Sequence, residues 1–271
     1  MMQLEADQPI GIFDSGVGGL TVAHSIKSLL PNEKIIYFGD TFHLPYGDKS
    51  SESVRYYSRR ISDFLLEKNC KTVLIACNTA SSSAFDEVVE HVAGRAIVLN
   101  VVDPVVSLVS KKHKDGKVGV IGTKGTINSK TYEQKIQQIN PSLEVISMAT
   151  PLFVPMIEEG FIYDDISNAI IRAYLSDKRF SQIHTMILGC THYPIIKRQI
   201  EKFFNFGIDI IDAADIVAQK LKSTLEEMEL NQKGKPGRHE FYISDYTPYF
   251  EKIAKMFFES AVHLEHLNFW K

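Results

Sequence analysis

Short apolar runs rich in β-branched and aromatic residues alternate along the chain with longer amphipathic segments. The short runs are typical of buried strands, and the longer segments repeat apolar residues at helical spacing. The predicted strands cover residues 9–13, 34–38, 72–76, 96–101, 117–121, 143–148, 183–188 and 207–211. The predicted helices between them cover residues 20–30, 51–68, 84–92, 130–138 and 195–204. Because parallel strands need long crossover connections, this alternation predicts an α/β protein with parallel sheets.

The order of features in the first half of the chain returns in the second half. In each half a strand leads into a glycine-rich loop, and a later strand ends at a cysteine, Cys77 in the first half and Cys190 in the second. The repeat predicts two similar doubly wound domains related by a pseudo-twofold axis. Open parallel sheets bind ligands at the carboxyl ends of their strands, so we expect an active site in the cleft between the domains.

The chain after residue 211 fits neither repeat. It reads as a helix over residues 216–229, a Gly/Pro/Lys loop, a strand-like HEFYISD and an amphipathic helix from Pro248. We expect this segment to return to the first domain, which would then comprise residues 1–99 and 213–271, with residues 100–212 forming the second domain. Phe269 and Trp270 at its end would pack on this domain or form a dimer contact.

Cys77 and Cys190 each stand between a strand and a predicted helix N-terminus, next to polar residues. The positive end of a helix favours a thiolate, so we expect thiol pKa values below the usual value of about 8.5, toward neutrality. The alternative is that both are small buried core residues. Two matching placements in a duplicated chain favour chemistry, whereas Cys70 lacks such neighbours and is predicted to be structural.

Two acid/base groups that face each other across a cleft suit one type of reaction. One group removes a proton from one face of a carbon, and the other returns a proton to the opposite face. Thiol and thiolate can exchange these roles for the reverse direction. The paired cysteines therefore predict racemisation or epimerisation.

Polar residues at the other strand ends are candidates for substrate binding. Asp14 and Ser15 end the first strand, before a glycine-rich loop that lacks the spacing of nucleotide-binding motifs. Tyr46 and Gly47 lie in the loop after the second strand, where a hydroxyl and backbone amides could hold a carboxylate. A plain turn would have the same composition.

The second half offers a corresponding set of candidates. Thr123 and Thr126 lie in its glycine-containing loop, where a helix N-cap is the alternative role. His192 follows Cys190 by two residues and could tune that thiol or carry a proton near neutral pH. Glu158 is a candidate to orient His192, whereas Glu159 is predicted to be a solvated charge.

Composition and charge limit the classes of partner that the protein can bind. The 271 residues include 30 Lys and Arg against 33 Asp and Glu, a net charge of −3, with no basic stripe of the kind that nucleic acid requires. The three cysteines match neither a disulfide framework nor paired zinc motifs. The first residues, MMQLEADQ, do not resemble a secretory signal, and no apolar run approaches a membrane span. We expect a cytoplasmic protein with a small-molecule substrate, no nucleic-acid or membrane partner, and a homodimer as one open alternative.

Five motifs together carry a resemblance to a known family. FDSGVGGLTV, YFGDTFHLPYG, ACNTAS, VPMIEEG and GCTHYP look like the motifs of bacterial glutamate racemases, within the aspartate/glutamate racemase superfamily, over nearly the whole chain. The resemblance implies interconversion of L- and D-glutamate without cofactor or metal, supplying D-glutamate for peptidoglycan synthesis. Aspartate racemases differ around the first loop and the second cysteine.

The resemblance also implies roles for individual residues. Cys77 would deprotonate D-glutamate and Cys190 would deprotonate L-glutamate, assisted by Asp14 and by His192 with Glu158 respectively. The residues at the family's substrate-binding positions are Asp14, Ser15, Tyr46, Gly47, Asn78, Thr79, Thr191 and His192.

Three other functions remain open on the sequence alone. A racemase of another amino acid, such as aspartate, would use the same two thiols. A thiol hydrolase or redox enzyme with Cys77 as nucleophile and His192 as base would leave Cys190 unexplained. A cytosolic small-ligand-binding protein could also be built from two lobes around a cleft.

Overall fold

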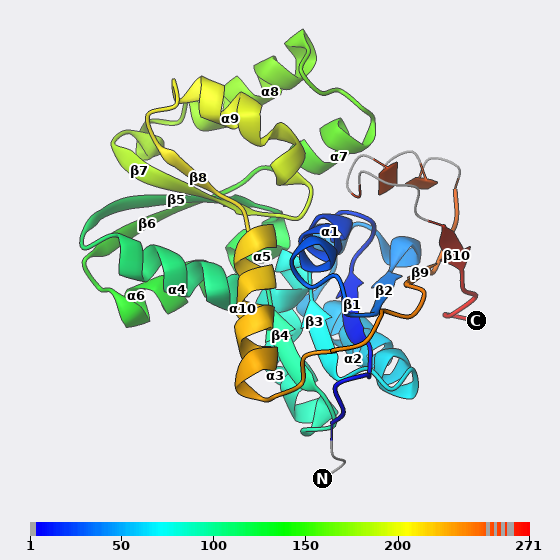
Figure 1. Cartoon of the computed structure of the whole chain (residues 1–271). Coiled ribbons are helices and arrows are strands. Elements are labelled where there is room, and N and C mark those ends of the chain that lie inside the picture. The colour runs from blue at the N-terminus through cyan, green and yellow to red at the C-terminus, as the bar shows by residue number, and fades with distance from the viewer. Residues whose placement is uncertain (1–3, 248–249, 252–253, 256–257, 259–262) are drawn as a thin grey trace.

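The computed structural model describes residues 4–247, 250–251, 254–255, 258 and 263–271. Within these residues the chain forms two sheets whose strand pairs are all parallel, and helices flank each sheet (Figure 1). This arrangement confirms the predicted α/β class with two parallel-sheet halves.

The first sheet has the strand order β10-β9-β2-β1-β3-β4. Its strands are β1 (Ile10–Asp14), β2 (Ile35–Gly39), β3 (Thr72–Ile75), β4 (Ile97–Asn100), β9 (Glu240–Ile243) and β10 (Leu264–His266). The last two strands come from the end of the chain, and β9 pairs with β2. The C-terminal segment therefore extends the sheet that the first hundred residues build.

The second sheet has the strand order β6-β5-β7-β8. Its strands are β5 (Gly116–Gly122), β6 (Leu143–Ala149), β7 (Ile183–Gly189) and β8 (Asp209–Ile211). The order repeats the β2-β1-β3-β4 arrangement of the first sheet, with the first strand of each half inside and the second at one side. Consequently β3 and β7, the strands that precede Cys77 and Cys190, hold equivalent positions.

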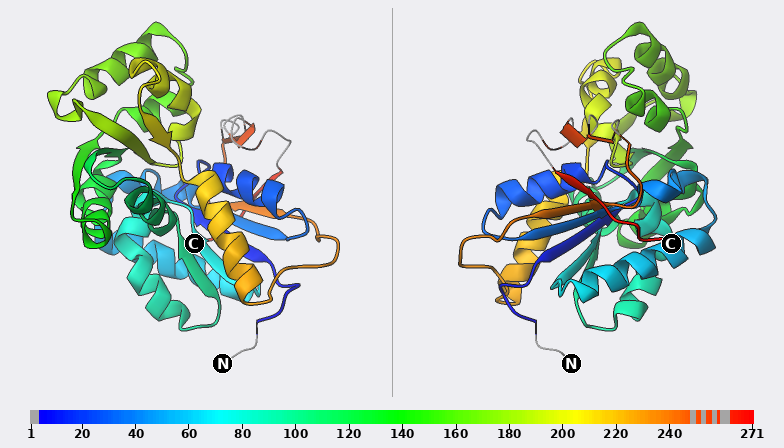
Figure 2. Two further views of the ribbon diagram at one scale, coloured as in Figure 1. Left: turned by 60° about the vertical axis from the view of Figure 1, so that its left-hand side comes forward. Right: turned by 90° about the vertical axis from the view of Figure 1, so that its right-hand side faces the viewer.

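Helices cover both faces of each sheet (Figure 2). They are α1 (Leu20–Leu29), α2 (Ser51–Glu67), α3 (Asn78–Val92), α4 (Val102–Lys112), α5 (Lys124–Asn128), α6 (Thr131–Ile139), α7 (Phe153–Glu158), α8 (Asp165–Leu175), α9 (Lys197–Phe203) and α10 (Ala214–Glu227). Helices α1 and α10 pack together on one face of the first sheet, and α2 and α3 on the other. In the second sheet α4 and α6 lie on one face and α7, α8 and α9 on the other.

The buried core follows the alternation of side chains along the strands. Ile10 and Ile12 of β1 face α1 and α10, whereas Phe13 faces α2 and α3. The apolar cluster around Ile10 continues into the second half, where it includes Val118 and Val120 of β5. The two halves thus share a continuous apolar core on this side.

Several helices begin earlier than predicted or were not predicted. Helix α3 begins at Asn78 rather than residue 84, because its polar first turn resembles a loop in the sequence. Helix α4 occupies a valine-rich stretch with strand-like composition, where the Asn100 side chain accepts hydrogen bonds from the amides of Val102 and Asp103 at 2.8 Å. Helices α5, α7 and α8 were also missed. Burial and local caps decide these segments, and neither appears in the hydrophobic pattern alone.

The C-terminal segment ends on the first sheet. The predicted helix from Pro248 falls largely on residues outside those described, and β10 was not predicted. Phe269 packs against Phe38 with ring centroids 4.8 Å apart, and the Trp270 indole Nε1 donates a hydrogen bond to Asp40 Oδ1 at 2.7 Å. Of the two roles considered for these aromatic residues, the structure shows packing on their own sheet.

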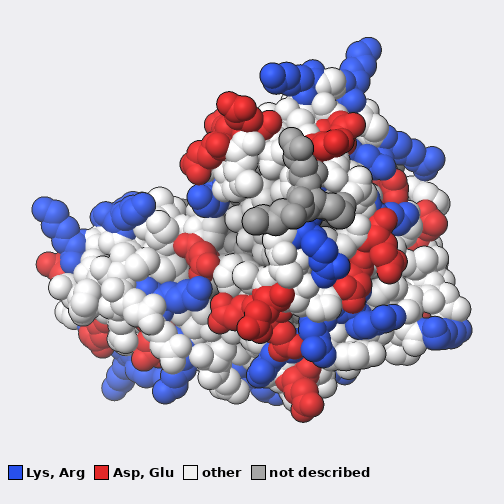
Figure 3. Space-filling view, turned by 90° about the horizontal axis from the view of Figure 1, so that it is seen from below, with Lys and Arg blue, Asp and Glu red and all other residues white. Residues whose placement is uncertain are grey.

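Charged side chains of both signs are interspersed on the face shown in Figure 3, with no continuous basic stripe. Among the helices of the described segments, none has both the length and the apolar character needed to cross a membrane.

Candidate active site

The two cysteine thiols line one small cavity between the halves of the molecule. Cys77 follows β3 and caps α3, and Cys190 follows β7. The cavity has a volume of about 30 Å³. Its lining comprises Ser15, Leu44, Pro45, Tyr46, Gly47, Cys77, Asn78, Thr79, Thr123, Val154, Gly189, Cys190, Thr191 and His192.

Most of the predicted site residues belong to this lining. Asp14, Thr126 and Glu158 instead lie behind it and contact residues that line it. Leu44, Pro45, Val154 and Gly189 were missed, because apolar residues and a strand glycine carry no chemical signal in a single sequence. The carboxyl ends of strands from both halves thus meet at one place.

Cys77 lies in a buried, weakly polar environment. Its thiol donates to Ser15 Oγ at 3.6 Å, and its sulfur accepts from the Ala80 amide at 3.5 Å. Burial, together with the neighbouring charge of Asp14, raises the pKa of Cys77 to about 12, although the contacts with the Ala80 amide and the Ser15 hydroxyl act in the opposite direction. The predicted lowering of this pKa toward neutrality is therefore wrong, because desolvation outweighs the helix N-terminus.

Asp14 is fully buried near Cys77. Its Oδ2 accepts hydrogen bonds from the amides of Gly16 at 3.1 Å and Gly19 at 3.0 Å, whereas Oδ1 has no hydrogen-bond partner among the described residues. A β-carbon at Gly19 would lie 2.6 Å from Asp14 Cβ, so only glycine permits this approach. Burial raises the pKa of Asp14 despite the opposing backbone hydrogen bonds and the charge of His192.

Cys190 has a different neighbour, a buried histidine. His192 Nδ1 lies 3.9 Å from Cys190 Sγ, and its Nε2 lies 3.1 Å from Glu158 Oε1. Burial alone would lower the pKa of His192, but hydrogen bonds and charge interactions with Cys190 and Glu158 outweigh it and raise this pKa to about 10. The ring is therefore an imidazolium at neutral pH, placed to stabilise a negative charge on the Cys190 sulfur.

Gly18 brings the backbone of the first half against this histidine. A β-carbon at Gly18 would lie 2.6 Å from both His192 Nδ1 and Thr191 Oγ1. The glycine-rich loop after β1 therefore permits close contact between the halves, in addition to shaping the surroundings of Asp14.

Three threonine hydroxyls connect the halves on the other side of the cavity. Thr79 Oγ1, on α3, lies 2.8 Å from Thr123 Oγ1 and 3.3 Å from Thr126 Oγ1, which both belong to the second half. The Thr123 and Thr126 hydroxyls are 3.2 Å apart, and Thr123 also caps α5. Thr123 therefore both caps α5 and lines the cavity.

Asp40 is a buried residue that supports the site and was not predicted. Its carboxylate accepts a hydrogen bond from the Tyr46 hydroxyl at 2.7 Å and others from Ser244 and Trp270, also at 2.7 Å, and it lies 2.8 Å from His43 Nδ1. Asp40 therefore fixes the loop that carries Tyr46 to β9 and to the C-terminal segment. Two of its partners, Ser244 and Trp270, lie more than 200 residues away in the chain, which conceals this role from the sequence.

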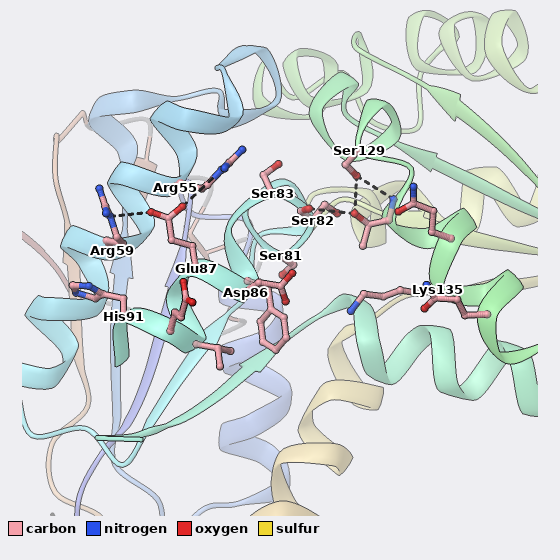
Figure 4. A pocket seen from close by; sticks show the side chains of 16 residues that line it. Arg55, Arg59, Ser81, Ser82, Ser83, Asp86, Glu87, His91, Ser129 and Lys135 are labelled. Carbon is pink, nitrogen blue, oxygen red and sulfur yellow. Dashed lines mark hydrogen bonds and ion pairs between the residues drawn. The ribbon is translucent and has the colours of Figure 1, made fainter. Parts of the chain in front are cut away.

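A larger groove lies beside α3 and α6 and contains neither of these two cysteines (Figure 4). Arg59 Nε and Arg55 Nε lie 3.2 Å and 3.8 Å from the carboxylate of Glu87, so opposite charges in it are paired. Within the described residues, no group of three or more His, Cys, Asp or Glu side chains is arranged to hold a metal ion. The small cavity whose lining includes both Cys77 and Cys190 is the stronger candidate for chemistry.

Comparison with known proteins identifies similar sequences and structures. The profile of a family described as Asp/Glu/Hydantoin racemase matches residues 19–221. The chain is 41% identical to a glutamate racemase of Chlorobaculum parvum over 256 residues, 94% of each chain, and 41% identical to one of Geobacter metallireducens over 249 residues, 92% of each chain. It is also similar to the crystal structure of a Francisella tularensis glutamate racemase in complex with D-glutamate, with a TM-score of 0.91, 40% identity and coverage of 98% of this chain and 99% of that one.

Proposed function

This chain belongs to the Asp/Glu/Hydantoin racemase family, and from that premise we propose that it interconverts L- and D-glutamate by moving the α-proton between two thiols. The observation that carries the proposal is that Cys77 and Cys190 follow equivalent strands of a duplicated fold and line one cavity. A nucleophilic thiol enzyme needs one such cysteine, whereas a two-base racemisation places one acid/base group on each face of the α-carbon.

Each turnover moves one proton to an enzyme sulfur and one from it. With L-glutamate, the thiolate of Cys190 removes the α-proton, and the electron pair remains on the α-carbon. The Cys77 thiol then delivers its proton to the opposite face, which yields D-glutamate, a Cys77 thiolate and a Cys190 thiol. D-glutamate reacts by the same steps with the roles exchanged.

The surroundings of the sulfurs fit this starting state. The raised pKa of Cys77 keeps it as a thiol at neutral pH, ready to act as an acid. The His192 imidazolium stabilises the negative charge that Cys190 carries as a base, and Glu158 holds the imidazole ring. Asp14, with its own raised pKa, is placed to exchange a proton with Cys77 when that sulfur must act as the base.

The weakly acidic α-proton requires stabilisation of the developing carbanion. Donors from Ser15, Asn78, Thr79 and Thr191 would hold the substrate carboxylates, with Tyr46, Gly47, Thr123 and Thr126 completing the pocket. Preorganised donors of this kind contribute about 3 kcal/mol each when water is excluded. The cavity of about 30 Å³ is far smaller than a ligand pocket of about 300 Å³ or more, so glutamate binding requires the halves to separate.

Several broader assignments belong to the same proposal. We assign residues 1–99 and 213–271 to one domain and residues 100–212 to the other. The reaction would need no cofactor or metal, and it would take place in the cytoplasm, supplying D-glutamate for peptidoglycan synthesis.

The decisive experiment incubates the protein with L-glutamate in deuterated water without added cofactor. We expect loss of optical rotation together with incorporation of deuterium at the α-carbon, measured by proton NMR. Absence of both signals would contradict the proposal. A parallel incubation with L-aspartate decides between substrates, since reaction with aspartate but not glutamate would favour the other racemase.

Variants of the cysteines test the two-thiol mechanism. Cys77→Ala and Cys190→Ala should each abolish racemisation in both directions, because each direction uses one thiol as acid and one as base. Cys70→Ala is the matched control, since Cys70 is buried outside the cavity and should leave activity near that of the unmodified protein. Full activity of the Cys190 variant would exclude the mechanism.

A further inference from the structure

A buried tyrosine of the second half contacts the residue that follows Cys77. The Tyr132 hydroxyl, on α6, donates a hydrogen bond of 2.7 Å to Asn78 Oδ1, on α3. Tyr132 is 2% exposed and Asn78 is 3% exposed, so water does not compete for this bond. Burial also raises the pKa of Tyr132, which keeps the hydroxyl protonated as a donor.

In this hydrogen bond the Asn78 amide turns its oxygen toward Tyr132. Because Oδ1 accepts from the hydroxyl, the other end of the amide, Nδ2, must point away from Tyr132. Asn78 lines the cavity, and within the described part of the chain Nδ2 has no hydrogen-bond partner. The amide therefore offers two N–H donors to the cavity rather than a carbonyl oxygen that would repel a carboxylate.

Tyr132 also packs beside the second cysteine. A β-carbon at Gly189, the residue before Cys190, would lie 3.6 Å from Tyr132 Cε2, so the ring covers this strand end. Tyr132 therefore bonds to the residue after Cys77 and lies close to the strand end that precedes Cys190.

The start of α6 is held to the start of α3 by a second bond. Thr131 Oγ1 lies within hydrogen-bond distance of the backbone carbonyl of Ser82, at 3.2 Å, and of Ser129 Oγ, at 3.0 Å. Figure 4 shows Ser82 and Ser129 facing each other across this contact between the halves. These contacts hold the first turn of α6, and thereby the position of Tyr132, against α3.

We propose that Tyr132 is a positioning residue that holds the Asn78 amide with its N–H donors toward the substrate carboxylate when the two halves are closed. This inference rests on the proposed function, because it assigns the cavity to an amino acid. It assigns an active-site role to a residue outside the cavity lining. Tyr132 acts through Asn78 and does not touch the reacting atoms.

Removal of the hydroxyl tests the proposal. In Tyr132→Phe the amide can rotate, and its oxygen loses its buried donor, so kcat/KM for glutamate should fall about tenfold. In Asn78→Ala, kcat/KM should fall at least as far. In Asn78→Asp it should fall further, since a carboxylate would then face the substrate. Tyr242→Phe is the control, because it removes a hydroxyl bonded to Glu240 at the same 2.7 Å outside the cavity lining, and it should retain kcat/KM.

The double variant separates positioning from general packing. If Tyr132 acts through Asn78, adding Tyr132→Phe to Asn78→Ala should change kcat/KM by less than about twofold. The reason is that the Asn78 side chain through which Tyr132 acts is already gone, so the effects of the two substitutions are not additive. If Tyr132 only supports packing, the full loss in kcat/KM caused by Tyr132→Phe should persist in the double variant. This outcome would overturn the proposal. Unchanged activity of Tyr132→Phe alone would overturn it as well. Circular dichroism confirms folding, and racemisation by the unmodified protein tests the proposed function separately.

Discussion

At the scale of single residues, the two thiols occupy equivalent strand ends but differ in electrostatic surroundings. Cys77 faces a hydroxyl, an amide and a buried carboxyl group, whereas Cys190 faces an imidazolium backed by a carboxylate. The two sulfur atoms are therefore electrostatically different before substrate arrives. The pseudo-symmetry of the fold supplies the geometry, and the neighbours supply the asymmetry.

The charge of His192 should appear in the pH dependence of stability. Its pKa in the folded protein is raised from 6.5 to about 10, so the stability that its charge provides is complete below pH 6.5 and is lost as pH rises through about 10. We expect the difference in the free energy of unfolding between the unmodified protein and His192→Asn to shrink over this window. Urea unfolding across the range measures it, and a difference that does not vary with pH would contradict the assigned charge.

Gly18 should tolerate no side chain. In Gly18→Ala the added carbon would lie 2.6 Å from His192 Nδ1, so the ring or the loop must shift. Misplacement of a catalytic group by about 1 Å costs roughly 100-fold, and we expect kcat/KM for glutamate to fall by about that factor. Gly234→Ala is the control, since the nearest atom to its added carbon is 3.6 Å away. Equal activity of the two variants would show that this contact is unimportant.

Much of the candidate site could be predicted residue by residue, because polar groups at strand ends and repeated Cys-polar motifs are visible in one sequence. The pKa of Cys77 could not, because its direction depends on burial, which a spacing pattern does not reveal. Asp40 was missed for a related reason, since it acts through partners distant in the chain.

At the scale of elements, a buried ion pair attaches the segment between α10 and β9 to the first sheet. Lys71 Nζ, beside β3, lies 2.6 Å from Glu33 Oε2 and donates to the Leu230 carbonyl at 2.8 Å, while Glu33 Oε1 accepts from the Gln232 amide at 2.9 Å. The Lys71 and Glu33 side chains are 0% and 2% exposed. The pair therefore joins the turn before β2 to the segment that leads to β9.

Lys71→Met should destabilise the protein by about 3–5 kcal/mol, because it leaves the Glu33 carboxylate buried without its partner. Adding Glu33→Gln removes that charge and should restore part of the loss. Lys112→Met serves as control, since the Lys112–Asp209 pair is nearly half exposed and should contribute less than about 1 kcal/mol. Equal losses for the two lysines in urea unfolding would contradict the importance of burial.

The hydrophobic pattern predicted strands and long helices better than the short helices near the site. Strands β1 to β8 all lie within one or two residues of their predicted positions. Helix α8 was missed although Asp164 and Ser167 form a capping box at its start. Short segments whose ends are set by caps and tertiary contacts leave little periodicity to detect.

At the scale of the whole molecule, the duplication was predictable, but the contacts between the halves were not. Equivalent strands carry similar motifs, which a sequence displays. The hydrogen bonds between the halves join Thr79 to Thr123 and Asn78 to Tyr132, which are 44 and 54 residues apart. Nothing in the local sequence of either partner indicates the other.

These contacts should set how often the halves separate. Thr79→Val keeps the shape of the side chain but removes the hydroxyl that bridges to Thr123 and Thr126, whereas Asp48→Asn weakens only an exposed ion pair with Lys124. A lost buried hydrogen bond of about 1 kcal/mol corresponds to roughly fivefold more frequent opening. We therefore expect amide hydrogen exchange in α5 to accelerate several-fold in Thr79→Val without ligand and to remain unchanged in Asp48→Asn.

Saturating D-glutamate should slow exchange in the unmodified protein, because bound substrate adds contacts to both halves. Equal exchange in the two variants would mean that the hydroxyl cluster does not hold the cavity closed.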